Sequence, residues 1–337
     1  MTPVAVFVYN RPDNTRRTLQ CLAANTLAKD TDVYVFSDGG KDAESWKRVG
    51  EVRKVLREFE ESKKQKMFKS FTICERPENY YLERNIIEGI NQVLTQHETV
   101  VVLEDDICTS PYFLQYMNET FDIYRDDKRV MHVSGFTRLD LINAHPDMLS
   151  SDSETYFSPH MAGWGWGTWR DRWQKHFVHY TSRAEALEGL TDEDISTLQY
   201  GGAFPCFNSL DKDPIPWDIC WGIAIQRAKG LCLYPAYTLV QNIGLGNGTH
   251  FRAFKILQHY NYNRKPLERP IVIRQTTPTV SQKIEALFAD AVKDWGIRYT
   301  LLGKVVRYFY KKGCRFWVIG YWLLIRLHFL TATQVEI

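Results

Sequence analysis

Three consecutive acids, Glu104, Asp105 and Asp106, follow directly after the apolar residues 99–103. Adjacent carboxylates repel one another and are costly to place together without a cation. Carboxylate oxygens suit Mg²⁺ and Mn²⁺, and such an ion is typically held by one or two carboxylates together with substrate phosphates. The alternative is a solvated acidic turn before a helix over residues 111–124. The position after a buried strand favours a metal site with Mn²⁺ or Mg²⁺ as the cofactor.

Two further polar clusters close apolar segments of the chain. Tyr9, Asn10 and Arg11 stand at the end of the first segment, and Asp38 with two glycines follows the second. Glycines permit close approach of a ligand to the backbone, and a carboxylate there could accept a hydrogen bond from a base imide or a ribose hydroxyl. An ordinary Asp-Gly turn is the alternative. Arg11 and Arg84 could neutralise phosphates, although Arg84 also fits a solvated helix charge paired with a glutamate.

A single acid lies between two large aromatic residues in the segment Trp217-Asp218-Ile219-Cys220-Trp221. A carboxylate flanked in this way is partly desolvated, which raises its pKa and its basicity. Asp218 is therefore a candidate general base. The alternative is an acid at the start of a helix with tryptophans packed beneath it, and the preceding proline fits a helix start.

Glycine and tryptophan alternate through residues 163–169, which include Trp164 and Trp166. Aromatic faces stack on sugar rings, and the glycines give such a loop room to approach a ligand. We therefore expect Trp164 and Trp166, with Trp217 and Trp221, to stack on a sugar, as aromatic residues do in binding a glycan acceptor. The alternative for this segment is a corner of the hydrophobic core.

The elements that must position these residues alternate along the first 106 residues. Apolar, β-branched segments predict strands at residues 3–9, 32–37, 68–74 and 99–103. Amphipathic patterns predict helices at residues 15–24, 44–63 and 82–94. This order is typical of a doubly wound parallel sheet, in which ligands bind at the carboxyl ends of the strands. The predicted fold class is therefore α/β, with a mixed, mostly parallel sheet flanked by helices.

The second half of the chain is less regular. Strands are predicted at residues 131–135 and 237–242, a loop at 140–155, and helices at 183–199 and 216–229. A glycine-rich loop follows and ends at His250. This histidine could bind a metal or a phosphate, although a lone histidine is more often structural.

Composition excludes several classes of protein. Of the 337 residues, 44% are apolar and 24% are charged, which excludes disordered and fibrous chains. Lys and Arg total 42 against 40 Asp and Glu, a balance that argues against nucleic acid as a partner. The seven cysteines include no C-x-x-C pair, so a disulfide framework or a zinc site is not expected. With no signal peptide and no apolar run of roughly 20 residues, a cytoplasmic location is expected.

Together these motifs resemble a GT-A glycosyltransferase, in particular N-acetylglucosaminyltransferase I and its bacterial relatives. The similarity spans roughly residues 4–252. It is carried by the segments VFVYNRPDNTRRTLQCL, SDGG, YYLERNIIEGINQVL, VVVLEDDICTSPYFLQYM, GWGWGTW, PWDICW and GTH. The segment WDICW has one acid where the family motif has two.

The resemblance implies a GT-A (Rossmann-like) fold and a role for each matching residue. The nucleotide-sugar would be bound by Tyr9, Asn10, Arg11, Asp38, Arg84, Glu104 and Asp105. The metal would be held by Asp106, with His250 near the phosphates, and Asp218 would be the general base.

The implied function is metal-dependent, inverting transfer of a sugar from a nucleotide-sugar, UDP-sugar first, to a glycan acceptor. The enzyme would be a hexosyl- or N-acetylhexosaminyltransferase of bacterial surface polysaccharide synthesis. One alternative is a sugar nucleotidyltransferase, which uses similar phosphate and metal chemistry. Another is an inactive glycan-binding or membrane-scaffold protein, against which the acidic run and Asp218 argue.

The predicted organisation is a catalytic domain over residues 1–255, a connecting segment over 256–296 and a tail over 297–337. The catalytic domain divides into a nucleotide-binding half, 1–106, and an acceptor-binding half, 107–255. Residues 297–330 carry seven Lys and Arg, nine aromatic residues and no acid. This composition predicts an amphipathic helix on an anionic membrane at the inner face of the cell membrane, near a polyprenyl-diphosphate-linked acceptor. A packed helix or a dimer seam is the alternative.

Overall fold

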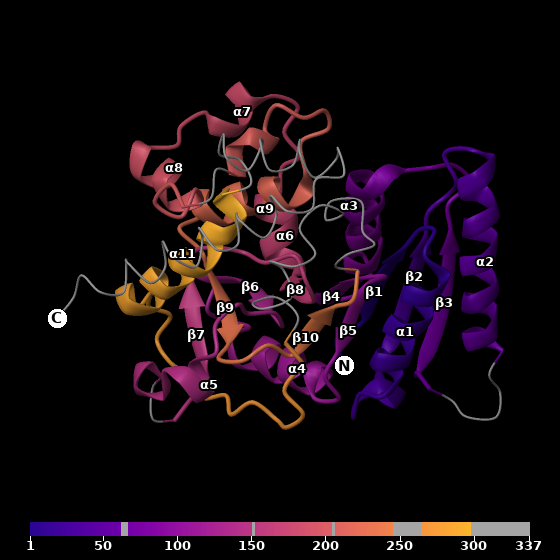
Figure 1. Ribbon diagram of the computed structural model, residues 1–337, viewed down its shortest axis with the longest axis horizontal. Coiled ribbons are helices and arrows are strands. Elements are labelled where there is room, and N and C mark those ends of the chain that lie inside the picture. The colour runs from indigo at the N-terminus through magenta and orange to yellow at the C-terminus, as the bar shows by residue number, and fades with distance from the viewer. Residues whose placement is uncertain (62–66, 150–151, 204–205, 245–263, 298–337) are drawn as a thin grey trace, which may run out of the picture.

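A mixed eight-stranded sheet forms the centre of the computed structural model, which describes residues 1–61, 67–149, 152–203, 206–244 and 264–297 (Figure 1). In order across the sheet the strands are β3 (Ser70–Glu75), β2 (Asp32–Ser37), β1 (Val4–Val8), β4 (Thr99–Glu104), β8 (Trp166–Trp169), β6 (Val130–Ser134), β9 (Leu231–Pro235) and β7 (Thr155–Ser158). The first four are parallel, as are β6 and β9, whereas β8 is antiparallel to both its neighbours and β7 is antiparallel to β9. The predicted α/β class with a mostly parallel sheet is confirmed.

A second, two-stranded sheet pairs β5 (Ile107–Thr109) with β10 (Val240–Asn242) in antiparallel fashion. The helices are α1 (Pro12–Ala23), α2 (Ala43–Glu60), α3 (Tyr81–Leu94), α4 (Phe113–Ile123), α5 (Leu141–Ala144), α6 (Arg170–His176), α7 (Arg183–Leu187), α8 (Asp192–Leu198), α9 (Trp217–Arg227) and α11 (Gln282–Ile297). Single 3-10 turns lie at Ala28–Asp30, Pro146–Met148 and Cys206–Ser209.

Two hydrophobic cores cover the two faces of the sheet. Successive residues of a strand point to opposite faces, so Val4, Val6 and Val8 pack with side chains of α1, α2 and α4. The alternate residues Ala5 and Phe7 pack in the other core with α3, α6, α9 and α11. Every residue of β1 is buried, because helices cover both faces. The result is three layers, helices on either side of one sheet.

The helices of the first half begin earlier than the sequence pattern predicts. The helix expected from residue 15 begins at Pro12, since the fixed φ of proline suits the first helical position and its missing N–H needs no partner there. The helix expected over 44–63 ends at Glu60 and starts after Asp42, whose carboxylate accepts the backbone N–H of Ser45 at 2.7 Å.

The second half contains strands that the sequence pattern did not predict, namely β5, β7, β8 and β9. The tryptophan-rich segment expected as a loop supplies β8, which lies at the centre of the sheet between β4 and β6. A Cβ at Gly167 would overlap the carbonyl oxygen of Val100 on β4, so glycine lets these strands pair. The single helix expected over residues 183–199 is two helices, α7 and α8, separated by Gly189 at a φ of +74°.

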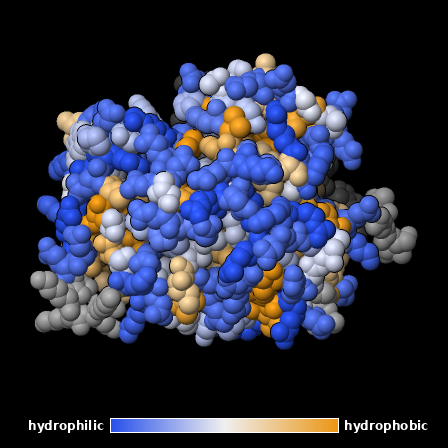
Figure 2. Space-filling view, turned by 180° about the vertical axis from the view of Figure 1, so that it is seen from behind, coloured by the Kyte–Doolittle hydropathy of each residue, from blue (hydrophilic) through white to orange (hydrophobic). Residues whose placement is uncertain are grey.

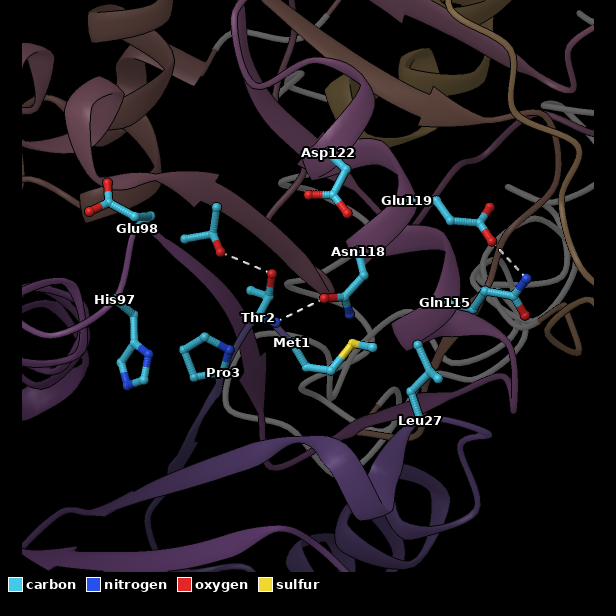
Figure 3. A pocket seen from close by; sticks show the side chains of 11 residues that line it. Met1, Thr2, Pro3, Leu27, His97, Glu98, Gln115, Asn118, Glu119 and Asp122 are labelled. Carbon is cyan, nitrogen blue, oxygen red and sulfur yellow. Dashed lines mark hydrogen bonds between the residues drawn. The ribbon is translucent and has the colours of Figure 1, made fainter.

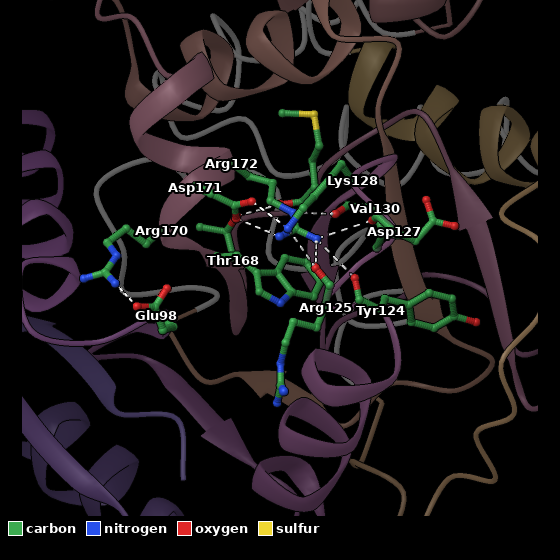
Figure 4. Close-up of polar contacts among 12 residues, drawn as sticks. Glu98, Tyr124, Arg125, Asp127, Lys128, Val130, Thr168, Arg170, Asp171 and Arg172 are labelled. Carbon is green, nitrogen blue, oxygen red and sulfur yellow. Dashed lines mark hydrogen bonds and ion pairs between the residues drawn. The ribbon is translucent and has the colours of Figure 1, made fainter.

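A buried arginine joins α6 to the end of α4. Arg172 is 3% exposed, and its Nη2 donates to the backbone oxygens of Tyr124 at 3.1 Å and Arg125 at 2.7 Å (Figure 4). The last carbonyls of a helix have no partner within the helix, and a positive charge is favourable there. Arg172 therefore satisfies the end of α4 and fixes α6 beside it.

The face opposite that of Figure 1 is largely hydrophilic, with apolar side chains in separate groups (Figure 2). Among the described residues, every helix is too short or too polar to cross a membrane. The predicted basic and aromatic tail, residues 297–337, lies outside the described part of the chain except for Ile297, the last residue of α11. The proposed boundary near residue 255 and most of the glycine-rich loop lie outside it as well.

Candidate active site

The carboxyl ends of three neighbouring parallel strands meet at one edge of the sheet. β2, β1 and β4 are adjacent, and their register brings the last residues of each strand level with one another. Arg11, Asp38 and the acidic run that begins at Glu104 therefore lie along the same edge, where open α/β sheets bind ligands. The structure thus brings together the three polar clusters that the sequence analysis singled out.

Arg11 contacts the acidic run directly. Its Nη1 donates to Asp106 Oδ2 at 2.9 Å and its Nε to Asp105 Oδ2 at 3.3 Å, while its Nη2 also pairs with Asp105. Burial alone would lower the pKa of Arg11, but the two carboxylates raise it above its ordinary value. The guanidinium neutralises protein acids in this structure, and its contact with a substrate phosphate stays a prediction.

The acidic run retains excess negative charge, because Arg11 supplies one positive charge against three carboxylates. Burial, followed by repulsion from Asp106 and Asp105, raises the pKa of Glu104 to about 8. Burial also raises the pKa of Asp105 to about 6, although Arg11 opposes the shift. Either protonation or added positive charge relieves such repulsion, and hard oxygen donors of this kind suit Mg²⁺ or Mn²⁺.

The carboxylates do not form a complete metal cage by themselves. No group of three His, Cys, Asp or Glu side chains within the described ranges could hold a metal ion. A Mg²⁺ ion commonly takes one or two protein carboxylates and completes its shell with water and substrate phosphates. Asp106, which is 9% exposed, fits that kind of ligand. His250, the second predicted ligand, lies outside the described residues.

Asp38 is held by the turn that follows β3. Its Oδ1 accepts the backbone N–H of Gly39 at 2.9 Å and of Tyr80 at 2.7 Å, and its Oδ2 accepts Asn79 Nδ2 at 3.2 Å. Burial raises the pKa of Asp38, while these backbone bonds oppose the shift. Asp38 therefore stands as a fixed acceptor at the end of β2, more elaborately held than an ordinary Asp-Gly turn. The support from residues 79 and 80 was not predicted from the sequence.

Asp218 is the second residue of α9, which begins at Trp217 after the N-cap residue Pro216. Burial raises the pKa of Asp218, and the negative charge of Glu83 on α3 acts in the same direction. The charge of Asp218 is also among those that raise the pKa of Glu104, after burial and the neighbouring acids. Asp218 is therefore within electrostatic reach of the acidic run, and its raised pKa suits a base.

The tryptophans expected to bind an acceptor are mostly core residues. Trp166 and Trp221 are fully buried and Trp217 is 4% exposed, with the rings of Trp166 and Trp217 stacked at 5.2 Å. The prediction that Trp166 and Trp221 contact an acceptor is therefore wrong for this conformation, because their rings pack against His132, Trp173 and each other. Trp164 is only partly buried and lies against Phe136, so its role stays a prediction.

Arg84 makes the helix ion pair that was the alternative to a phosphate contact. Its side chain is 50% exposed, and it donates to Glu88 at 2.7 Å and to Glu78 at 3.2 Å. Its guanidinium also lies 3.6 Å from the ring centroid of Tyr80, the residue whose backbone binds Asp38. Arg84 therefore borders the Asp38 turn, and its role in nucleotide binding stays a prediction.

Tyr9 and Asn10 connect β1 to Arg11. Both are partly exposed. The hydroxyl of Tyr9 is buried and has no hydrogen-bond partner among the residues described, while the backbone of Tyr9 hydrogen-bonds the carboxylate of Asp105. The two residues lie at the acidic run as expected, and their contact with a nucleotide stays a prediction.

The end of β10 packs against Asp106. The backbone N–H of Ile243 donates to the carbonyl oxygen of Asp106 at 2.8 Å, and that of Gly244 donates to Asn242 Oδ1 at 2.8 Å. A Cβ at residue 244 would overlap the carboxylate of Asp106, so only glycine fits. The sequence analysis noticed this loop for its histidine and missed the contact of its first glycine with the acidic run.

Two open pockets lie away from this edge. One, of about 610 Å³, is lined by the start of the chain and by α4, with His97, Asn118 and Asp122 among its side chains (Figure 3). The other, of about 770 Å³, lies beside residues 152–154 and 272–276. The first is at the amino end of β1 and β4, opposite the end at which the polar clusters meet. Neither pocket includes a predicted site residue.

The mixed, mostly parallel α/β sheet, with polar side chains at the carboxyl ends of its parallel strands, fits the GT-A class of glycosyltransferases. The model of the GNT-I family matches residues 1–179, more than half of the 337 residues. The chain belongs to the GNT-I family and is a glycosyltransferase.

Solved structures of TarS from S. aureus are similar to this chain in part. One has 12% sequence identity and a TM-score of 0.34, and the match covers 55% of this chain and 32% of that one. A TarS 1-349 structure in complex with UDP has 13% identity and a TM-score of 0.34, with 58% of this chain and 54% of that one covered. The chain thus matches about a third to a half of the length of these structures. No curated protein matches the sequence.

Proposed function

We propose that this glycosyltransferase moves a hexosyl or N-acetylhexosaminyl group from a UDP-sugar to a hydroxyl of a glycan acceptor, with inversion at the anomeric carbon. The observation that carries the proposal is the meeting of Arg11, Asp38 and the acidic run at one sheet edge, with Asp218 within electrostatic reach. The donor would lie along that edge and the acceptor on the side of α9.

The donor is bound by groups that differ in chemistry. Asp38 presents a fixed carboxylate for the N–H of a nucleobase imide. Glu104 and Asp105 would accept hydrogen bonds from ribose and donor-sugar hydroxyls. Arg11 and Arg84 supply positive charge for the diphosphate. Tyr9 and Asn10 line the start of the same site.

Asp106 would hold a Mn²⁺ or Mg²⁺ ion together with oxygens of the diphosphate, and His250 is a second candidate ligand. Such an ion, when bound, stabilises the negative charge of the departing nucleoside diphosphate. The support is the crowding of three acidic side chains at the end of β4, where Arg11 is paired with both Asp105 and Asp106.

Asp218 would act as the general base. As a carboxylate it accepts the proton of the acceptor hydroxyl while that oxygen attacks the anomeric carbon from the face opposite the leaving diphosphate. The burial that raises its pKa also raises its basicity. Inversion needs one base and no covalent intermediate, so Asp218 alone would suffice for this step.

The acceptor side is supported by sequence alone. The basic and aromatic residues 297–330 favour binding at an anionic membrane surface, where a polyprenyl-diphosphate-linked glycan would present its sugar. We therefore place the enzyme on the inner face of the cell membrane, in the synthesis of a bacterial surface polysaccharide.

A donor screen tests the proposal. The melting temperature of the full chain is measured with Mn²⁺ and, in turn, with UDP-sugars and with GDP-, CDP- and dTDP-sugars. Binding to the folded state stabilises it by mass action, so a UDP-sugar should raise the melting temperature most. Hydrolysis of radiolabelled donor then confirms turnover. Stabilisation by nucleoside triphosphates and free sugar phosphates instead would indicate a nucleotidyltransferase.

A further inference from the structure

Two cysteines that lie far apart in the sequence meet where α1 packs on β5. Cys21 is near the end of α1, and Cys108 is the middle residue of β5. Both thiols are free, and the thiol of Cys108 donates a hydrogen bond to the sulfur of Cys21. The sequence analysis expected no disulfide because it found no C-x-x-C pair, whereas this pair is formed by the fold.

Hydrogen bonds on either side of the thiols hold the two elements in register. The hydroxyl of Thr18, three residues before Cys21, donates to the carbonyl oxygen of Asp105 at 2.9 Å. Four residues after Cys21, Asn25 Nδ2 donates to Thr109 Oγ1 at 2.9 Å. Residues three and four apart share one face of a helix. The side chain of Cys21 therefore faces the stretch between residues 105 and 109, which includes its partner.

The two thiols differ in accessibility and in reactivity. Cys21 is partly exposed, whereas Cys108 is 5% exposed. The hydrogen bond from Cys108 and the positive charge of Arg17, one helical turn before Cys21, lower the pKa of Cys21 to about 7, although burial opposes them. The thiolate is the form that attacks a disulfide. Cys21 is therefore suited to react first, and Cys108 lies in place to react with it.

Other cysteines of the described residues lack this combination. Cys74 on β3 is also partly exposed, but burial raises the pKa of its thiol, and its sulfur accepts the amide of Gln92 at 3.8 Å. Cys220 and Cys232 are buried, and burial raises the pKa of both thiols. An accessible thiol with a lowered pKa and a second thiol in contact is the arrangement expected of a redox-sensitive pair.

We propose that Cys21 and Cys108 are a redox-modified pair, which a small disulfide such as oxidised glutathione converts to a Cys21–Cys108 disulfide. The Cys21 thiolate attacks one sulfur of the oxidant, forms a mixed disulfide and releases one glutathione thiol. The Cys108 sulfur then attacks the sulfur of Cys21, and the second glutathione thiol leaves. Two protein thiols are oxidised, one glutathione disulfide is reduced to two thiols, and the two cysteine protons end on those thiols.

The cross-link would fasten α1 to the strand that follows the acidic run. Residues 22–107 would lie in the closed loop. A disulfide that closes a long loop lowers the conformational entropy of the unfolded chain and so stabilises the folded state. Since Thr18 and Asn25 already fix the spacing of α1 and β5 on either side of the pair, the bond should close without displacing the helix.

The test uses the full chain, reduced with dithiothreitol, freed of it and then incubated with oxidised glutathione. Trypsin releases residues 18–29 and 85–125, each with one of the two cysteines, so mass spectrometry without reductant should find these peptides joined. The melting temperature should rise by about 5–10 °C on oxidation. Dithiothreitol should return both readouts to those of the reduced protein.

Three variants assign the effect to this pair. Cys21→Ser and Cys108→Ala should each abolish the joined peptides and the rise in melting temperature, and Cys108→Ala should retain glutathione on Cys21. Cys74→Ser is the matched control, since it removes another partly exposed cysteine and should leave both readouts unchanged. The melting temperature of each reduced variant shows whether it is folded.

Three outcomes would overturn the inference. The first is wild-type protein in which glutathione stays on Cys21 while Cys108 remains a thiol, because the two sulfurs then do not meet. The second is oxidation confined to other cysteines. The third is a joined pair with a lowered melting temperature, because the bond would then distort the contact of α1 with β5. These measurements need no donor sugar, so their outcome is independent of the proposed function.

Discussion

The two halves of the sheet, strands β1 to β4 and strands β6 to β9, differ in strand direction and in the side chains that they present. Strands β1 to β4 are parallel, alternate with helices, and carry charged and polar residues at their carboxyl ends. Strands β6 to β9 are partly antiparallel, and Trp166 of β8 packs in a cluster of tryptophan rings with Trp217 and Trp221 of α9. One end thus gathers charged side chains at the strand ends, here called the charged end, and the other, the aromatic end, holds one acid, Asp218, beside packed aromatic rings.

The two ends also differ in the polar partners that stabilise their buried charged groups. Arg11 pairs with Asp105 and Asp106, and Asp38 is held by backbone N–H groups, so the first end offsets burial with specific polar partners. Asp218 accepts the N–H of its neighbour Ile219 at 2.9 Å, and its pKa is raised by burial. Substitutions at the two ends should therefore impair different steps, donor binding at the one and sugar transfer at the other.

The largest effect is expected for Asp218→Asn, which keeps the shape of the side chain and removes its basicity. Sugar transfer should fall by about 10²- to 10⁴-fold, the usual contribution of a general base. Donor affinity, measured by calorimetry, should be unchanged because the variant leaves Arg11, Asp38 and the acidic run intact. A fall in transfer of less than tenfold would assign the base to another residue.

Asp106→Ala, in the acidic run after β4, should abolish metal-dependent binding of the donor. The dissociation constant of the UDP-sugar should no longer respond to Mn²⁺, because the carboxylate that shares the ion with the diphosphate is gone. Titrations with Mn²⁺ and with EDTA measure the effect, and far-ultraviolet circular dichroism checks the fold. Unchanged metal-dependent turnover in this variant would contradict the assignment.

The aromatic cluster should determine stability and not acceptor affinity. Trp166→Ala removes a fully buried ring and should lower the free energy of unfolding by about 3–5 kcal/mol, as for other large-to-small changes in a core. Urea unfolding of the wild-type protein and the variant measures the difference. Trp166→Phe, the milder change, should leave the KM for the acceptor unchanged. A large rise in that KM in a stable Trp166→Phe protein would restore Trp166 to the acceptor site.

How far the sequence predicts the molecule differs between the same two ends. β2 has the predicted residues, 32–37, because continuous β-branched and apolar runs between helices are strong local signals. β8, with the sequence WGTW, carries no such signal, since its two tryptophans and a glycine fit a strand only when β4 and β6 are present on either side. Tertiary pairing outweighs local propensity there.

The candidate site shows the same limit. Strand-end position alone was enough to group Arg11, Asp38 and the acidic run, because parallel strands bring their ends together. The support of Asp38 by residue 80, some 40 positions along the chain, has no local signature. The contact between the thiols of Cys21 and Cys108 is likewise evident only once α1 lies against β5.

The pH dependence of sugar transfer should follow the titration of Asp218. Only the carboxylate form of Asp218 accepts a proton, so transfer is lost as the pH falls through the pKa of this group. Burial raises that pKa, so the acid limb should lie above the ordinary range of an aspartate, which is about 3.9. Initial rates at saturating donor and Mn²⁺ measure the limb. Its persistence in the residual activity of Asp218→Asn would assign it to another group.

The smallest effect is expected for Arg84→Met, at the border of the charged end. Arg84 is half exposed and pairs with Glu88 one turn along α3, and exposed pairs of this kind contribute little to stability. The melting temperature should therefore stay within error of the wild-type value. The affinity for UDP should fall less than tenfold, because the guanidinium over the Tyr80 ring adds positive charge near the diphosphate without a fixed bond. Arg57→Met, measured in parallel, controls for the loss of any surface arginine on this side of the molecule. If the two variants bind UDP equally well, Arg84 belongs to the helix surface alone and takes no part in nucleotide binding.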